Sequence, residues 1–226
     1  KVKGRFQELV LVEPIEQLLY LASTQIDASR TMQNDDSVIE SLASLAKRTG
    51  FVSQNFSEAT ALALAPLEPF AAYVITQAIQ RYGQNERSLF SFLNARGRNS
   101  LSEYEGKMYQ LQCCYDYIYY NFYSYLKEAN ADSMQWSSMQ VAIERVEGQL
   151  WETKTDLVDA IKLVKAIGLL NLFGNASFKM NREDTALYAK TALNIENPTG
   201  LLKKLEQFKI IRYASYKFRY ILFDGT

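Results

Sequence analysis

The chain has 226 residues, of which 48% are hydrophobic and 22% are charged, and 25 basic and 25 acidic residues leave a formal net charge of zero. These proportions are ordinary for a globular protein. The absence of histidine from the sequence excludes a Ser-His-Asp or Cys-His catalytic site, and zinc binding by histidine, within these residues. The two cysteines, Cys113 and Cys114, are adjacent, so they predict neither a disulfide nor a metal site and fit a reduced, cytoplasmic setting.

The ends and the charge distribution give two further expectations. No apolar run has the length of a membrane span and no signal peptide is recognisable, so we predict no membrane partner. The chain begins at Lys1 rather than at methionine, and we expect it to be a fragment of a longer protein. Residues 197–226 contain six basic and two acidic residues, which makes the C-terminal end the basic pole.

The first two thirds of the chain predict mainly helices. Residues 1–25 have the pattern of a short strand followed by a helix, as at the end of an α/β layer. Residues 30–148 predict a helical bundle, in which Ser37 caps a helix that Gly50 ends. An aromatic seam over residues 107–128 predicts one long helix. Its tyrosines could stack on bases, but tyrosine hydroxyls at the edge of a helical core are the better interpretation.

The stretch Leu67–Gly97 predicts two helices joined by a tight corner. Pro69 suits the first position of the first helix, where its missing N–H is not needed. Gly83 is expected to end that helix in the left-handed conformation, and Asn85 is the expected N-cap of the second helix.

Arg87 is the unusual residue of this corner. It falls in the first turn of the second helix, where the helix dipole disfavours a cation. We therefore expect Arg87 to have a partner. The partner is either a carboxylate, such as Glu86 or Glu68, or a bound anion such as a phosphate.

Residues 151–226 predict three helices followed by a β-hairpin. The helices are expected over 156–173, from the cap Asn181, and over 198–208, and the hairpin turns near Tyr216. This is the element order of a winged helix, whose third helix can enter a major groove and whose hairpin can reach the backbone. The predicted fold class is therefore mainly α: a helical bundle followed by a winged-helix domain with a small hairpin.

Basic residues gather on the third of these helices and on the hairpin. They are Lys203, Lys204, Lys209, Arg212, Lys217 and Arg219. Clustered cations on a protruding element predict contacts to nucleic-acid phosphates. The helix lacks a set of Arg, Asn and Gln suited to reading bases, so we expect sequence-independent binding. The alternatives are a solvated charged face, or a hairpin that packs on another domain.

Several stretches together carry a family resemblance over nearly the whole chain. They are KVKGRFQELVLVEPIEQLLYL, RYGQNERSLFSFL, YDYIYYNF, QWSSMQVAIERVE, AIKLVKAIGLLNLF and YILFDGT. The chain resembles the C-terminal part of large bacterial ATP-binding proteins with a P-loop core of the AAA+/STAND type. Members of this family are ATPases often found in prokaryotic defence.

The resemblance implies three domains: residues 1–25 as the tail of an ATPase core, 26–150 as a helical lid and 151–226 as a winged helix. It also implies that the ATP-binding motifs lie upstream, and no P-loop motif occurs in the chain. ATP and Mg²⁺ would then bind the parent protein, and this chain would hold no cofactor, metal or catalytic residue. By analogy with AAA+ lids, Arg87 would reach the γ-phosphate and Arg5 would lie near the nucleotide or a neighbouring subunit.

The resemblance thus implies a non-catalytic, cytoplasmic part of a bacterial P-loop ATPase that couples nucleotide state to a DNA or protein partner, in phage defence. A rigid-body swing of the lid would reposition the winged helix. The upstream ATPase core is an expected partner, and self-association stays open. The alternative is a helical adaptor or transcription regulator that uses a winged helix for protein or DNA contacts.

Overall fold

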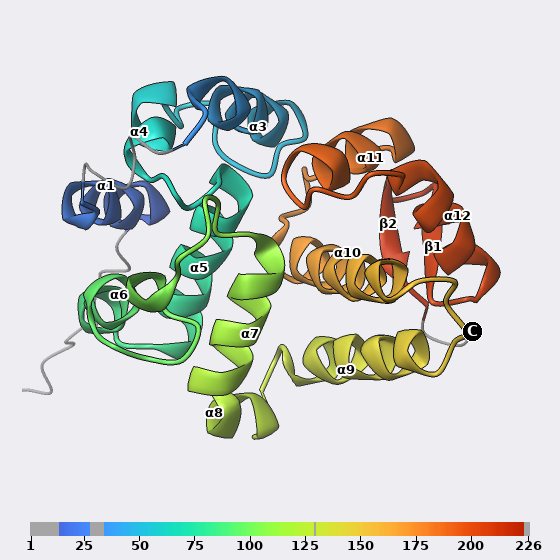
Figure 1. The fold of residues 1–226 in the computed structure, drawn as a ribbon. Coiled ribbons are helices and arrows are strands. Elements are labelled where there is room, and N and C mark those ends of the chain that lie inside the picture. The colour runs from blue at the N-terminus through green and yellow to red at the C-terminus, as the bar shows by residue number, and fades with distance from the viewer. Residues whose placement is uncertain (1–13, 28–33, 129, 224–226) are drawn as a thin grey trace, which may run out of the picture.

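The computed structural model describes residues 14–27, 34–128 and 130–223, which form a mainly helical fold with one small antiparallel sheet (Figure 1). This confirms the predicted mainly α class. The elements are α1 (Ile15–Gln25), α3 (Asp36–Arg48), α4 (Glu58–Ala63), α5 (Pro69–Tyr82), α6 (Asn85–Asn94), the 3₁₀ turn η1 (Leu101–Glu103), α7 (Leu111–Asn121), α8 (Tyr123–Lys127), α9 (Ser133–Glu147), α10 (Lys154–Phe173), α11 (Arg182–Thr191), α12 (Pro198–Gln207), β1 (Ile211–Ala214) and β2 (Arg219–Leu222). The strand expected before α1 lies outside the described residues.

Side-chain caps decide where several helices begin. Asn181 caps α11 as predicted, and Asn197 caps α12, each accepting an amide N–H three residues ahead. Thr153 begins α10 with a reciprocal capping box. The predicted Ser37 cap is wrong, because the Asp35 carboxylate caps α3 by accepting the Ser37 N–H at 2.9 Å.

The corner between α5 and α6 differs from the prediction at two residues. Gly83 has φ −116° and ψ −164°, which is extended rather than left-handed. Asn85 lies inside α6, and the N-cap is Gln84, whose amide N–H donates to the Ser88 hydroxyl oxygen at 2.7 Å. A Cβ at position 83 would lie 2.6 Å from that oxygen. The corner therefore requires glycine because of close approach and not because of its backbone angle.

The aromatic seam forms two helices where the periodicity predicted one. Phe122 separates α7 from α8 with φ −114° and ψ 19°. The Asn121 side chain donates to the Arg98 carbonyl at 3.3 Å, and the Phe122 ring lies 6.1 Å from the Tyr82 ring. These partners come from distant parts of the chain, so tertiary contacts accompany a break that the local pattern does not signal.

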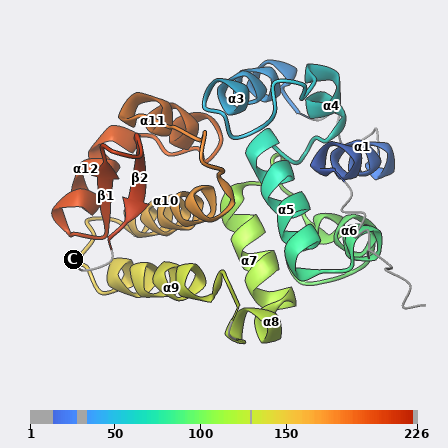
Figure 2. The same ribbon diagram turned by 180° about the vertical axis from the view of Figure 1, so that it is seen from behind.

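The helices pack around α5, which is buried along most of its length and contacts α1, α3, α6, α7 and α10 (Figures 1 and 2). α10 packs in turn on α7 and α9. Buried apolar residues on both sides of residue 150 belong to one continuous core. Among the helices of the described ranges, none combines the length and the apolar composition that crossing a membrane requires.

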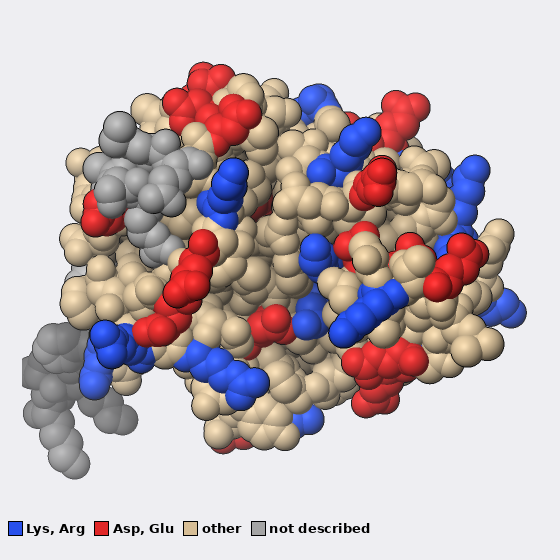
Figure 3. Space-filling view, viewed as in Figure 1, with Lys and Arg blue, Asp and Glu red and all other residues tan. Residues whose placement is uncertain are grey.

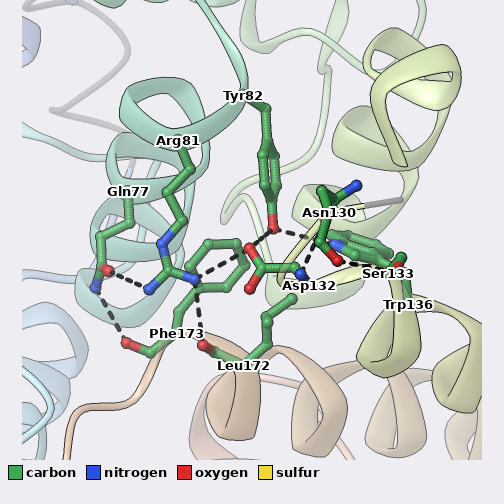
Figure 4. Close-up of polar contacts among 9 residues, drawn as sticks. All are labelled: Gln77, Arg81, Tyr82, Asn130, Asp132, Ser133, Trp136, Leu172 and Phe173. Carbon is green, nitrogen blue, oxygen red and sulfur yellow. Dashed lines mark hydrogen bonds and ion pairs between the residues drawn. The ribbon is translucent and has the colours of Figure 1, made fainter. Parts of the chain in front are cut away.

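Figure 4 shows a polar junction where the ends of α5 and α10 meet the start of α9. The Asp132 carboxylate accepts a hydrogen bond from the Tyr82 hydroxyl at 2.6 Å and pairs with Arg81 at 3.3 Å. The Trp136 indole donates to the Tyr82 oxygen at 3.1 Å, and Arg81 donates to the carbonyl of Leu172 at 3.5 Å. Burial and the bond to Asp132 raise the pKa of Tyr82, so the phenol stays neutral.

The hairpin lies between α12 and α10 in both ribbon views (Figures 1 and 2). β1 and β2 pair with Ile211 opposite Leu222 and Ala214 opposite Arg219. The segment before α11 lies beside β2, because the Met180 amide donates to the Phe218 carbonyl at 2.8 Å. The same segment is tied to the end of α3 by the Lys179 N–H and the Thr49 carbonyl at 2.9 Å.

Candidate nucleic-acid interface

Three of the six predicted phosphate-contacting residues are exposed and lie on the third C-terminal helix, after it, and on the hairpin turn. Lys203 is on the outer side of α12, Lys209 follows α12 and Lys217 lies in the turn between β1 and β2. None of the three forms a salt bridge with a residue that the structure describes. Lys209 has φ +55° in the turn that ends α12, which directs the chain into β1.

The other three residues are half-buried, and Lys204 and Arg219 already have side-chain contacts within the fold. Lys204 lies 3.6 Å from the Glu152 carboxylate and its ammonium is 5.4 Å from the centre of the Trp151 ring. Arg219 stacks over Phe178 and donates to the Phe178 carbonyl at 3.4 Å. Lys204 is therefore partly covered by the α9–α10 link and is less available for a phosphate than the three exposed lysines.

The two hairpin arginines are incompletely satisfied. The Nε atoms of Arg212 and Arg219 are buried and have no hydrogen-bond partner among the described residues. Burial lowers the pKa of Arg219. Neither guanidinium forms a salt bridge with a described carboxylate. These arginines add uncompensated positive charge to the hairpin, where a bound anion would offset part of the cost of burial.

Arg182, which was not predicted, holds α12 against the hairpin. Its guanidinium pairs with Glu206 at 3.0 Å and donates to the Tyr220 hydroxyl at 2.9 Å. It also stacks over the rings of Tyr213 and Tyr220, 4.4 and 5.4 Å from their centres. Local sequence patterns do not signal this role, because the partners of Arg182 lie on α12 and on the hairpin, which follow it in the chain.

The hairpin tip (Ser215–Phe218) has a second cationic neighbour that sequence reasoning missed. Lys179 is exposed, and its ammonium lies 5.1 Å from the centre of the Phe218 ring. The apolar–polar–apolar alternation of Phe178, Lys179 and Met180 was the available signal, since it is that of a strand. The structure places this segment beside β2, which brings Lys179 to the hairpin tip.

The two predicted nucleotide-sensing residues stand apart from this surface. Arg87 is exposed and forms no salt bridge with any side chain that the structure describes. The predicted partner Glu68 does not pair with Arg87, because the Glu68 side chain is fully buried as the cap of α5. The side chain of Glu86, like the whole of Arg5, lies outside what the structure describes.

Glu68 is the most perturbed acid of the fold. Its carboxylate accepts the amide N–H groups of Phe70 and Ala71 at 2.8 and 2.9 Å and the Tyr188 hydroxyl at 2.9 Å. Burial raises the pKa of Glu68 to about 7, and the three hydrogen bonds oppose that rise. Because Tyr188 belongs to α11, this contact links the helical bundle to the C-terminal elements.

A groove of about 910 Å³ lies between the start of α10 and the start of α12. Its charged lining has two lysines and four carboxylates, Glu152, Asp156, Asp159 and Glu196, which gives a net charge of −2. That charge disfavours a phosphate-bearing ligand, although two helix N-termini open nearby. Across the described ranges, no three Asp, Glu or Cys side chains gather closely enough to hold a metal ion.

The charges on the face of the molecule in Figure 3 are mixed. Lys and Arg side chains alternate with Asp and Glu over the C-terminal elements and form no broad patch of one sign. On this face, any phosphate contacts would therefore depend on individual lysines. Comparisons of the chain with protein-family models, with curated proteins and with solved structures return no match.

Proposed function

We propose that residues 151–226 form a winged helix that binds the nucleic-acid backbone without reading its sequence. The order of α10, α11, α12 and the hairpin supports this assignment. Further support comes from the segment between the first and second of these helices, where the Met180 N–H bonds the Phe218 carbonyl just before β2. In this assignment α12 is the third helix and the hairpin is the wing.

The observation that carries the proposal is the exposure of three lysines without salt-bridge partners on α12, after it and on the hairpin. Lysine side chains on protruding elements supply phosphate contacts, and such contacts need no particular base. Thr199 and Gln207 are the other exposed side chains of α12, and two separate polar groups offer little for base discrimination.

We further propose that residues 26–150 are the lid that joins this winged helix to an upstream P-loop core, as the family resemblance implies. The chain would then be the non-catalytic part of a cytoplasmic ATPase, and ATP and Mg²⁺ would bind the core. Arg87 is free of described ion pairs, which leaves its charge available for a phosphate held by that core. A swing of the lid would carry the winged helix with it.

The test compares two variants that each exchange three lysines for glutamate. The first changes Lys203, Lys209 and Lys217, and the control changes exposed lysines elsewhere, Lys107, Lys127 and Lys154. Both variants alter the net charge equally, so a general electrostatic effect lowers the affinity of both. Fluorescence anisotropy of a labelled DNA duplex gives the affinity between about 50 mM and 200 mM salt.

Loss of three phosphate contacts reduces the slope of log affinity against log salt concentration by about 2.7. The first variant is expected to have this smaller slope, and the control is expected to keep the slope of the unchanged chain. Equal slopes for both variants would refute the lysine surface. A chain that binds no duplex at about 50 mM salt would refute nucleic-acid binding altogether.

A further inference from the structure

The hairpin tip presents two aromatic rings to solvent side by side with cations. Tyr216 is 68% exposed and Phe218 is 53% exposed. The ammonium of Lys217 lies 5.6 Å from the centre of the Tyr216 ring, and that of Lys179 lies 5.1 Å from the centre of the Phe218 ring. All four residues of the turn, from Ser215 to Phe218, are exposed. The tip is therefore a small aromatic surface with positive charge at both rings.

Backbone contacts hold this surface in one conformation. Two turn hydrogen bonds, to the carbonyls of Ala214 and Ser215, close the tip at 3.0 and 3.3 Å. Phe218 has φ +52°, in the left-handed region that aromatic residues seldom adopt. The Met180 N–H bonds the Phe218 carbonyl and stabilises this backbone. The backbone that carries the rings thus has little conformational entropy left to lose on binding.

The charges indicate what kind of molecule would cover these rings. Neither Lys179 nor Lys217 forms a salt bridge with a carboxylate in the described part of the chain. An apolar protein surface would leave both ammonium groups facing it unpaired, which is costly. A nucleotide instead offers a flat base for the ring and a phosphate for the neighbouring lysine.

We propose that the hairpin tip stacks on an unpaired base, so that the chain prefers a junction between duplex and single strand. This inference rests on the proposed nucleic-acid function. Bases inside a duplex are already stacked on both faces, so the interior of a duplex offers an exposed ring no base face, whereas an unpaired base does. The lysines on and after α12 would hold the duplex while Tyr216 and Phe218 contact the first base beyond it.

The test measures affinity for a blunt DNA duplex and for the same duplex with a single-stranded thymidine tail. The key variant replaces both tip rings by leucine, Tyr216→Leu with Phe218→Leu, which keeps apolar bulk and removes the stacking face. The matched control is Tyr120→Leu with Tyr123→Leu, because those rings are 54% and 48% exposed and also have a cation over them, at 4.9 and 5.3 Å.

Stacking of one base on one ring corresponds to roughly a fivefold to 150-fold gain in affinity. We expect the unchanged chain and the control to bind the tailed duplex tighter by about that factor. The leucine variant is expected to bind both DNAs with the affinity that the unchanged chain has for the blunt duplex. A Tyr216→Trp variant should keep the preference, and its added tryptophan fluorescence should be quenched by the tailed duplex.

The possible failures separate the two proposals. A leucine variant that keeps the preference, or an unchanged chain without any preference, overturns the stacking inference while duplex binding through lysines stands. A chain that binds neither DNA overturns both and leaves a protein partner as the occupant of the tip. Circular dichroism of each variant confirms that the helices are retained.

Discussion

Replacing the buried acid Glu68 by glutamine should remove a pH dependence from the stability of the fold. The pKa of Glu68 is raised from 4.5 to about 7, mainly because burial disfavours its charged form. Between these two values the folded chain keeps a proton that the unfolded chain has released. Stability therefore falls as the pH rises from about 4.5 to about 7. At about 1.4 kcal/mol per pH unit, the fall due to this one group is roughly 3 kcal/mol.

Glu68→Gln is neutral at every pH and cannot contribute such a fall. The variant retains one side-chain oxygen for two of the three donors around it, the N–H groups of Phe70 and Ala71 and the Tyr188 hydroxyl. One donor loses its acceptor, which costs about 1–3 kcal/mol independently of pH. As the pH rises from 5 to 8, the stability of the unchanged chain relative to the variant should thus fall by roughly 3 kcal/mol, so that its advantage at pH 5 disappears or reverses.

Urea unfolding followed by tryptophan fluorescence at several pH values measures this difference. The absence of histidine makes the background small, because few other groups titrate in this range. Glu58→Gln is the control, since Glu58 is an exposed first-turn acid on α4. Parallel stability profiles for Glu68→Gln and the unchanged chain would refute the reasoning, and would mean that the carboxylate titrates normally in the fold.

Three other substitutions test separate parts of the structure. Gly50→Ala should destabilise the fold by about 1–3 kcal/mol in urea unfolding. The reason is that Gly50 has φ +73° and that an added Cβ would lie 2.9 Å from a backbone oxygen. The control Gly148→Ala should cost little, because the atom nearest to its added Cβ would be 3.4 Å away. Asp132→Ala should lower the free energy of unfolding by about 1–3 kcal/mol. It should also alter tryptophan emission, because Asp132 accepts from the Tyr82 hydroxyl to which the Trp136 indole donates. Unaltered emission would contradict the junction. Within the proposed P-loop ATPase, Arg87→Ala should lower ATPase activity without loss of stability, and the reverse outcome would assign Arg87 a structural role.

Local signals predicted much of the secondary structure. Asn181, Asn197 and Pro69 occupy the helix-start positions expected of them, because capping depends on residues only a few positions apart. The hairpin and its turn were also predictable from β-branched and aromatic residues around a polar link. These features need no knowledge of what packs against them.

Features that depend on distant partners were not predictable in the same way. The break at Phe122 coincides with contacts from α5 and from the loop before η1. Glu68 looked like an available partner for Arg87, yet Tyr188, 120 residues later in the chain, completes its buried site. Lys204 has the spacing of an outward-facing residue and is nonetheless partly covered by the α9–α10 link, which contains Trp151.

The contact between Lys179 and Thr49 has a mechanical consequence. The N–H of Lys179 bonds a carbonyl at the end of α3, while the lysine side chain lies over a ring of the hairpin tip. The Glu68–Tyr188 hydrogen bond is a second contact between elements before and after residue 150. The hairpin tip is therefore coupled to α3 by a hydrogen bond across residue 150 and not only by the covalent chain. Exchange of the Lys179 amide hydrogen measures how often this contact opens.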